Sequence, residues 1–547
     1  MEMPRRFVAE IKLGGNVYRV KDNYECEYFS ARLTHKKDRV SLEIAPADEM
    51  IFEDIRLTAE LAAGFDDRVF MNGYQSRTES CELRAGDKMH CPKKKAFPML
   101  EKLSLDRTGD YGFVDYLHTH GDLHGFSYCY IRKDGEYLLI GSLSERNGFT
   151  VISLSAGTEM LTMRLDCEGA VYRDKFTALD IAILTGGEDE VFDRYFEMMK
   201  CRKPDVLPLT CRTTSYSFGN DIGEYCILRE IEDIRRSSVA APDLYRIGAG
   251  WQTEAGCTAV PDLRKFPEGM RPISDAIHEA GMLSGIRFTP FVCSAYPEVY
   301  KDHANWLLRD KNGDPVPADA DTYALDFCCP EFKEHIRSQI DTILNDWGFD
   351  MIEFDLLYAV CELPHEGRSR GQLMCEAMDF LRECMGDKLL LAAGVPLMPA
   401  FGIADYCRVS CDIRKEWDFR RDKKRNSREQ PSVRNAMLGN IFRRQLNGRA
   451  FLNDPGDFLL SEESNSLLHC QRQSLAFIDH LCGSLYSTSD NENDCTPRAR
   501  KILSTARRLT SAKLISAEVI GSAVELTIEL NGARRTVRLC GNGKLTD

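Results

Sequence analysis

The sequence predicts a multi-domain protein of mixed α/β and β class: a central (β/α)8 barrel of the TIM type, an N-terminal β-sandwich and a small C-terminal β domain. Short apolar strands alternate with amphipathic helical stretches through the middle of the chain, whereas both ends show apolar alternation of period two between turn residues. The length agrees, because 547 residues at ~100–200 residues per domain correspond to two to four domains.

Residues 1–205 are predicted to form the β-sandwich with a linker helix. Its strand candidates, all with period two, are 17–20, 40–44, 137–140 and 149–154. Glycine-containing pairs such as Asp134-Gly135 and Asn147-Gly148 supply the turns. From residue 192 to residue 199 the apolar spacing becomes helical, which indicates the linker helix.

Residues 206–497 are predicted to form the barrel. Its eight strand candidates are 209–216, 244–251, 285–291, 351–355, 389–393, 407–412, 449–453 and 485–489. Helical stretches lie between them, for example 330–347, with apolar side chains on one face, and 372–385. Eight strand–helix units over about 290 residues match a (β/α)8 barrel in count and size.

Residues 498–547 are predicted to form the C-terminal β domain. Segments 517–520, 524–528 and 536–539 alternate again, and Asn531-Gly532 is a hairpin turn of the kind that joins two antiparallel strands.

Composition and charge exclude several classes of protein. Hydrophobic residues make up 43% and charged residues 29%, as in ordinary globular proteins, which excludes a disordered or fibrous chain. The formal net charge of −14 repels polyanions, so we expect no nucleic acid and no anionic membrane as a partner. Small molecules remain as ligands, and a homo-oligomer stays compatible with the sequence.

The 21 cysteines predict a reducing compartment. Their number is odd, they are scattered along the chain, and the adjacent Cys328 and Cys329 cannot form an ordinary loop-closing bridge. We see neither a signal peptide nor an apolar stretch of the ~18 residues that span a bilayer. We therefore expect a soluble, cytoplasmic protein.

Two carboxylates stand out at the predicted strand ends, where barrels of this class place their active sites. Asp355 ends an otherwise apolar strand, and Asp412 ends the sixth strand. A pair of carboxylates across a barrel mouth suits glycoside hydrolysis, in which one attacks the anomeric carbon and the other protonates the leaving oxygen. The structural alternative is that one acid caps a helix and the other pairs with Arg408 or Arg414.

Motifs along the barrel, in order, resemble the family 36 glycoside hydrolases, a family typified by α-galactosidases. They include YRIGAGWQ at 245–252, GIRFTPF at 285–291, WGFDMIEFDLLYA at 347–359, RVSCD at 408–412, NDP at 453–455 and SDN at 489–491. The resemblance implies that Asp355 is the nucleophile and Asp412 the general acid/base of a retaining enzyme. It also implies that neither a metal nor an organic cofactor is needed.

The departures from the family pattern fall on sugar-binding positions. The two aspartates that hold galactose O4 and O6 in the family are Gly248 and Ala249 here, and the lysine two residues before the nucleophile is Glu353. Three explanations remain open. Side chains from other loops replace these contacts, or the substrate is a different sugar, for instance an amino sugar. The third is that the chain binds a sugar without hydrolysing it. Retention of Asp355 and Asp412 argues against the last reading.

Other side chains near the strand ends are candidates for substrate binding. The aromatic rings offer stacking surfaces for a sugar, and the polar groups offer hydrogen bonds, although each has an alternative role in packing or ion pairing. The predicted substrate-binding residues are Trp251, Glu353, Arg408, Tyr216, Trp417, Asn453 and Asp454.

The sequence therefore predicts a retaining exo-α-glycosidase that is α-galactosidase-like and acts on an oligosaccharide or glycoconjugate. The alternatives are an α-N-acetylgalactosaminidase, a galactosaminidase or another α-hexosidase, and a non-hydrolytic carbohydrate-binding protein. Transfer of the sugar to another sugar instead of water also remains open.

Overall fold

The computed structural model describes residues 2–89, 108–237, 240–254, 256–296, 301–319, 321–417, 428–461, 465–491 and 495–546. Every cysteine among them is a free thiol. None of the helices in these ranges has the length and apolar character needed to cross a membrane.

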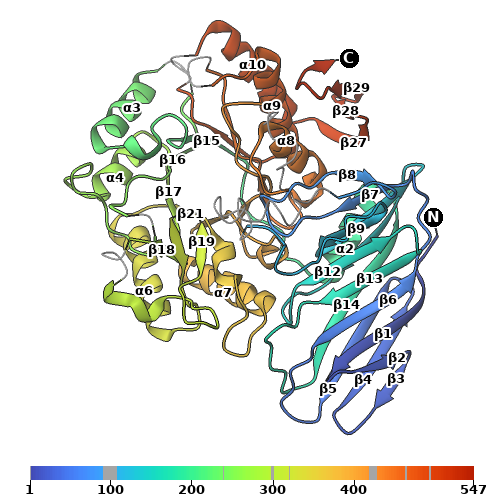
Figure 1. Cartoon of the computed structure of the whole chain (residues 1–547). Helices are drawn as coiled ribbons and strands as arrows, with labels where there is room; N and C mark the ends of the chain where they lie inside the picture. The colour runs from blue at the N-terminus through green and yellow to red at the C-terminus, as the bar shows by residue number, and fades with distance from the viewer. Residues whose placement is uncertain are drawn as a thin grey trace.

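Two antiparallel sheets form the N-terminal sandwich (Figure 1). The six-stranded sheet has the order β2-β1-β6-β13-β12-β9, with bounds β1 Arg5–Leu13, β2 Asn16–Val20, β6 Asp54–Glu60, β9 Asp122–Phe126, β12 Thr150–Ser155 and β13 Met160–Leu165. The eight-stranded sheet has the order β3-β4-β5-β14-β11-β10-β7-β8, with bounds β3 Asn23–Glu25, β4 Phe29–Lys36, β5 Arg39–Pro46, β7 Arg68–Met71, β8 Glu82–Arg84, β10 Tyr128–Lys133, β11 Glu136–Ser142 and β14 Phe176–Gly186.

The eight-stranded sheet is buried on both faces where it meets the barrel. On β10, Cys129 and Ile131 join the core between the two sheets, whereas Tyr128 and Tyr130 join the core shared with the barrel. Successive side chains of a strand point to opposite faces, which explains this division. Helix α2 (Glu188–Met199) packs on the second face and contains the predicted helix 192–199.

A curled parallel sheet of nine strands forms the centre, in the order β24-β23-β22-β21-β17-β16-β15-β26-β25. The chain passes from β24 into β25, which pairs with β26, and Ser484 N donates to Asn453 O at 2.9 Å between the seventh and eighth predicted strands. The bounds are β15 Leu209–Thr213, β16 Leu244–Ile247, β17 Leu283–Phe288, β21 Met351–Phe354, β22 Leu389–Ala392, β23 Tyr406–Arg408, β24 Leu452–Asp454, β25 Asp457–Phe458 and β26 Leu485–Thr488.

Several predicted barrel strands end earlier than expected. The sixth was predicted to reach Asp412, yet β23 ends at Arg408. Beyond it, Val409 N donates to Asp454 O at 3.2 Å, but Val409 O accepts from the buried side chain of Arg443 at 2.9 Å. This side-chain contact takes the place of a strand partner, and Asp412 therefore lies on the loop after the strand.

Helices surround the parallel strands (Figure 1). Local signals explain where several begin: Ser369 caps α7, Ser432 caps α8, and Thr496 with Pro497 begins α10. The bounds are α3 Glu224–Arg236, α4 Arg271–Glu279, α6 Pro330–Asp341, α7 Arg370–Met385, α8 Val433–Phe442, α9 His469–Cys482 and α10 Pro497–Leu509. The predicted helix 330–347 is α6 followed by one π-helical turn, η4 (Thr342–Asp346).

Short elements lie in the loops of the barrel. An antiparallel sheet in the order β18-β20-β19 follows β17 and was not predicted; its strands are β18 Val292–Ser294, β19 Pro317–Asp319 and β20 Thr322–Ala324. The 3-10 turns are η2 Gly219–Asp221, η3 Lys301–Trp306, η5 Leu357–Cys361, η6 Met398–Ala400 and η8 Arg444–Leu446.

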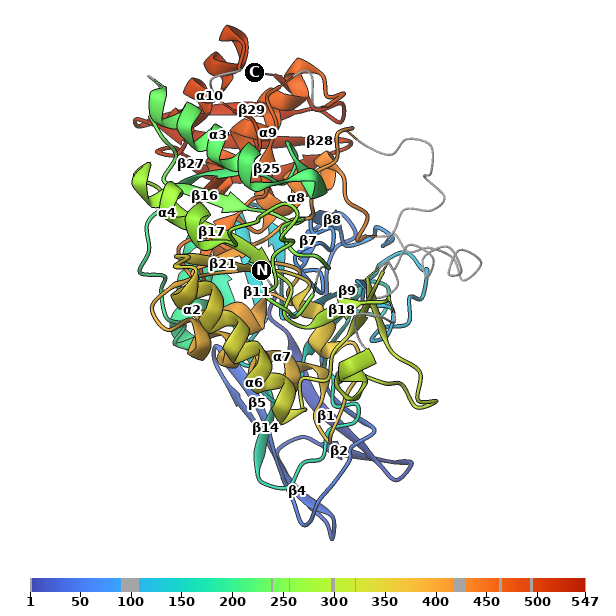
Figure 2. The same cartoon turned by 90° about the vertical axis from the view of Figure 1, so that its left-hand side faces the viewer.

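The C-terminal domain is a four-stranded antiparallel sheet of β27 Lys513–Ile520, β28 Ala523–Leu530, β29 Ala533–Leu539 and β30 Leu545–Thr546. Asn531 and Gly532 join β28 to β29 with φ angles of 52° and 76°, as the predicted hairpin turn requires. Figure 2 shows this sheet at the end of the molecule away from the tips of β2 and β4. The predicted fold class is confirmed, while the predicted boundary between residues 497 and 498 falls at the start of α10.

Candidate active site

The barrel interior is layered along β21. Residues two apart on a strand share a face, so Met351, Glu353 and Asp355 follow one another through the interior toward the carboxyl end. Met351 belongs to an apolar cluster with inward residues of neighbouring strands. Glu353 lies in a layer of charged side chains, and Asp355 lies at the end where this fold places its active sites.

Asp355 is a buried carboxylate surrounded by hydrogen-bond donors. Arg287 Nε and Nη2 donate to Asp355 Oδ2 at 3.0 and 2.7 Å, and the Leu356 backbone N–H donates to Oδ1 at 2.7 Å. Leu356 has a φ of 57°, a left-handed conformation uncommon for leucine. Burial alone would raise the pKa of Asp355, but Arg287 and Arg77 outweigh it and hold that pKa well below its usual range. Asp355 is therefore ionised at neutral pH.

Asp412 is the more open of the two predicted catalytic carboxylates. Its side chain is 46% exposed, against 10% for Asp355. Arg408 Nη1 donates to Asp412 Oδ1 at 3.0 Å. A single atom, Arg77 Nη2, lies 3.8 Å from Asp412 Oδ2 and 3.6 Å from Asp355 Oδ1. The two carboxylates therefore lie across one small space, with a guanidinium beside both.

Arg77 comes from the sandwich and was missed by the sequence analysis. It lies in the loop between β7 and β8, which reaches the barrel by a backbone hydrogen bond from Ser76 N to Val395 O at 3.1 Å. Burial disfavours its charge, but Asp355 and Asp412 outweigh burial and raise the pKa of Arg77. No periodicity or motif marks this arginine in the sequence, because its place depends on how two domains pack.

Glu353, Arg408 and Asp454, three of the predicted substrate-binding residues, lie in the buried charged layer. Arg246 Nε lies 3.3 Å from Glu353 Oε2, and Arg408 Nε donates to Asp454 Oδ2 at 2.8 Å. Asp457 completes the layer, with Oδ1 3.5 Å from Arg246 Nη2; burial raises its pKa to about 6. Glu353 is therefore paired with Arg246 within the barrel and does not stand as a lone negative charge beside Asp355.

Trp251 and Asn453 make contacts that favour packing roles over the predicted sugar contacts. Trp251 is 1% exposed, its ring packs edge-on against Trp347, and its Nε1 donates to Arg287 O at 2.9 Å. Asn453 is fully buried, and its Nδ2 donates to Arg443 O at 3.2 Å. Trp251 thus supports the backbone of the arginine that holds Asp355.

Trp417 packs against the C-terminal domain. Its Nε1 donates to Gly541 O at 3.1 Å, and Gly543 approaches the ring so closely that an added Cβ would lie 2.6 Å from it. These contacts likewise favour packing over the predicted sugar contact. Tyr216, by contrast, lines a cavity of about 630 Å³ together with Lys415, which lies on the same loop as Asp412.

Gly248 cannot simply be replaced by the aspartate of the family pattern. A Cβ at Gly248 would lie 2.6 Å from Ser215 Oγ, because the loops after β15 and β16 approach each other here. Gly248 N also donates to Thr214 Oγ1 at 2.9 Å. The missing carboxylate therefore reflects a different local packing of the two loops.

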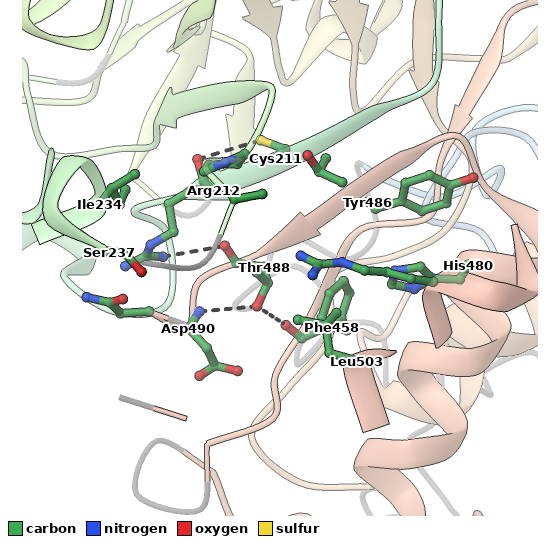
Figure 3. Close-up of a pocket in the computed structure, with 15 residues that line it drawn as sticks. Cys211, Arg212, Ile234, Ser237, Phe458, His480, Tyr486, Thr488, Asp490 and Leu503 are labelled. Atoms are coloured by element: carbon green, nitrogen blue, oxygen red, sulfur yellow. Dashed lines mark hydrogen bonds between the residues drawn. The ribbon is translucent and has the colours of Figure 1, made fainter. Parts of the chain in front are cut away.

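A second, more apolar pocket lies between β15, β26 and α10 (Figure 3). His480, Tyr486 and Leu503 line it, and His480 stacks on Tyr486 at 4.7 Å between ring centroids. The described lining includes neither Asp355 nor Asp412, so this pocket is separate from the carboxylate pair.

Comparisons with known proteins find similarity to glycosidases. Residues 257–380 match the Melibiase family model; this segment contains Asp355 and ends before Asp412. An A type blood α-D-galactosamine galactosaminidase from Flavonifractor plautii is 32% identical over 162 residues, which cover 28% of this chain and 15% of that protein. In this relative and in three α-galactosidases that also match, the matched segments span no more than 18% of the length of the relative.

Solved structures match over nearly the whole chain. An α-galactosidase from Thermus thermophilus, in complex with p-nitrophenyl α-D-galactopyranoside, has a TM-score of 0.70 and 23% identity, covering 96% of this chain and 98% of that one. The GH36 α-galactosidase AgaA from Geobacillus stearothermophilus has a TM-score of 0.60 and 10% identity, covering 93% and 72%. The predicted resemblance is confirmed: the barrel contains a Melibiase segment, and the chain has the fold of the family 36 α-galactosidases.

Proposed function

We propose that this protein is a retaining exo-acting α-glycosidase of the α-galactosidase type, with Asp355 as nucleophile and Asp412 as general acid/base. The observation that carries the proposal is the contrast between the two carboxylates. Asp355 is buried and kept ionised by Arg287, whereas Asp412 is 46% exposed and reaches solvent. A retaining enzyme needs this division between an ionised nucleophile and a carboxyl group that exchanges protons.

The reaction would proceed by two displacements. Asp355 attacks the anomeric carbon while Asp412 gives its proton to the departing glycosidic oxygen, which forms a covalent glycosyl-enzyme. Asp412 then takes a proton from water, and that water displaces Asp355 with net retention. The Arg287 hydrogen bonds to Oδ2 fix the orientation of the Asp355 carboxylate throughout.

The substrate we propose is an oligosaccharide or glycoconjugate with a terminal α-linked galactose-type sugar. The Thermus thermophilus α-galactosidase has been solved with p-nitrophenyl α-D-galactopyranoside and with stachyose. The cavity lined by Tyr216 and Lys415 includes neither carboxylate, but it borders the loop that carries Asp412 and would offer room for a leaving group. We further propose domain limits of 1–205, 206–497 and 498–547 and a cytoplasmic location.

An amino sugar is the second candidate, favoured by the identity with the Flavonifractor galactosaminidase. Glu353 is a poor receptor for a cationic amine, because it already balances Arg246 within the buried layer. A 2-acetamido sugar carries no such charge and fits the same carboxylate pair.

Aryl α-glycosides of galactose, N-acetylgalactosamine, galactosamine and glucose test the proposal. We expect turnover of at least one galactose-type sugar with retention, loss of many orders of magnitude in Asp355→Ala, and in Asp412→Ala a greater loss for poor leaving groups than for activated aryl ones. Absence of turnover of all four by the folded wild type would overturn the enzymatic proposal. Binding without turnover in calorimetry would instead favour the non-hydrolytic alternative.

Product analysis at high sugar concentration separates hydrolysis from transfer to a second sugar. We expect free monosaccharide as the main product. Predominant oligosaccharide products would assign the chain to transglycosylation.

A further inference from the structure

The loop from β7 to β8 is anchored in the barrel by an unusual buried cation. Arg443 has no exposed surface, and among the described residues it donates to backbone carbonyls and to the Asn72 amide oxygen, not to a carboxylate. Its Nη1 donates to Ser76 O at 2.8 Å and its Nη2 to Gln75 O at 3.0 Å, while Nε donates to Asn72 Oδ1 at 3.0 Å. This anchor fixes the backbone on the N-terminal side of Arg77.

The same loop is also held on the C-terminal side of Arg77. Ser80 Oγ, on this side, accepts a hydrogen bond from Gly73 N at 3.0 Å. Glu79 N donates to Arg428 O at 2.7 Å. A Cβ at Gly73 would lie 2.5 Å from Thr78, so the loop is closed tightly upon itself. Arg77 is therefore presented to the barrel by a braced turn.

The Arg77 guanidinium retains donors for a ligand. Its distances of 3.6 Å to Asp355 and 3.8 Å to Asp412 are ion-pair distances and exceed hydrogen-bonding range. Within the part of the chain that the structure describes, this guanidinium donates no hydrogen bond. Its side chain is 17% exposed, so it lies at the edge of the space between the two carboxylates.

The reaction geometry identifies which part of the sugar lies beside Arg77. This step rests on the proposed function, in which the anomeric carbon approaches Asp355 and the glycosidic oxygen approaches Asp412. Because Arg77 Nη2 flanks both carboxylates, it lies beside the anomeric centre, whose ring neighbours are O5 and C2, and C2 is the neighbour that carries a substituent. Hydrogen bonds at this position strengthen in the transition state of glycoside hydrolysis.

We propose that Arg77 is a specificity-determining residue that the sandwich contributes to the sugar site, and that it requires a hydrogen-bond acceptor at C2 of the sugar. A guanidinium has only donors, so it donates to a hydroxyl oxygen or an acetamido carbonyl and repels an ammonium group. Arg287 beside Asp355 adds a second positive charge. The site thus selects galactose or its 2-acetamido form against the free 2-amino sugar.

Activity on four aryl α-galactosides that differ only at C2 tests this assignment: 2-hydroxyl, 2-acetamido, 2-deoxy and 2-ammonium. We compare the wild type with Arg77→Gln and Arg77→Lys, and use Arg84→Gln, an exposed sandwich arginine paired with Asp66, as the matched control. Arg77→Gln should lower kcat/KM about 10- to 100-fold for whichever of the 2-hydroxyl and 2-acetamido sugars is turned over, as expected for one charged hydrogen bond. It should change the 2-deoxy sugar less than 3-fold, and Arg77→Lys should recover part of the loss.

An equal loss on all four sugars in Arg77→Gln, or a wild type that prefers the 2-ammonium sugar, would overturn the inference. Calorimetry of Asp355→Asn with galactose and 2-deoxygalactose tests it without catalysis, and weaker binding of the 2-deoxy sugar is expected. Equal affinities would refute the role of Arg77 even if hydrolysis were observed. Lack of hydrolysis with preserved discrimination would refute only the proposed function.

Discussion

The paired hydrogen bonds from Arg287 to Asp355 lead to a quantitative prediction about how activity depends on pH. The change Arg287→Gln removes the guanidinium from a carboxylate that is only 10% exposed and leaves Arg77 as the nearby cation. Each hydrogen bond to a charged group is worth about 1.5–3 kcal/mol. The ionised form of Asp355 therefore loses roughly 3–6 kcal/mol of stabilisation, and each ~1.4 kcal/mol is a factor of ten in its ionisation equilibrium.

The sign follows from which form Arg287 stabilises. Because it stabilises the carboxylate, its removal raises the pKa of Asp355, and the activity that depends on the ionised form is lost at a higher pH than in the wild type. In the wild type we expect no fall in kcat/KM from protonation of Asp355 above about pH 4. In Arg287→Gln we expect kcat/KM to fall on the acidic side above this pH.

The assay is kcat/KM for an activated aryl α-galactoside between pH 4 and 8, with folding checked by circular dichroism at each pH. Arg287→Lys is the matched variant, because it keeps a positive charge and loses the paired geometry, so its acidic limb should fall between the other two. An Arg287→Gln profile that superimposes on the wild-type profile would refute the reasoning that Arg287 keeps Asp355 ionised.

Three further outcomes concern stability and specificity. Burial raises the pKa of Glu145 to about 8. The free energy of unfolding of the wild type, measured in urea, should therefore fall by several kcal/mol relative to that of Glu145→Gln as pH rises from about 4.5 to 8. A difference that does not depend on pH would contradict this. Trp417→Phe removes the hydrogen bond to Gly541 and should lower the unfolding free energy by about 0.5–1.5 kcal/mol with KM unchanged; a raised KM would restore Trp417 to the sugar site. Gly248→Ala should lower the free energy of unfolding by about 1–3 kcal/mol through overpacking against Ser215. The additional change Ser215→Ala should restore part of this loss, and thermal unfolding measures both changes.

The arrangement of strands could be predicted because each barrel strand is a short apolar run with its own helical partner. The strand ends were harder to predict. The apolar and small residues of 409–411 continue the strand pattern, but the Val409 carbonyl bonds to Arg443 instead of a neighbouring strand. Backbone hydrogen-bond partners from distant side chains leave no mark on local periodicity.

The candidate site was predictable where its residues lie on the barrel and unpredictable where they do not. Asp355 and Asp412 stand at or near strand ends, as the fold requires. Arg77 comes from a sandwich loop, and only the packing of two domains brings it to Asp355. Trp251 shows how such a prediction stays open, because a tryptophan near a strand end is as well suited to supporting a backbone as to stacking on a sugar.

The braced loop that carries Arg77 has an evolutionary consequence. Its residues belong to the sandwich, so changes there would alter what surrounds Asp355 and Asp412 while the sequence of every barrel strand stays the same. If Arg77 has the proposed role, substrate preference would change on exchange of this one buried turn while the barrel strands are inherited unchanged. Grafting the segment 72–80 between relatives of this fold offers a direct route to new sugar preferences.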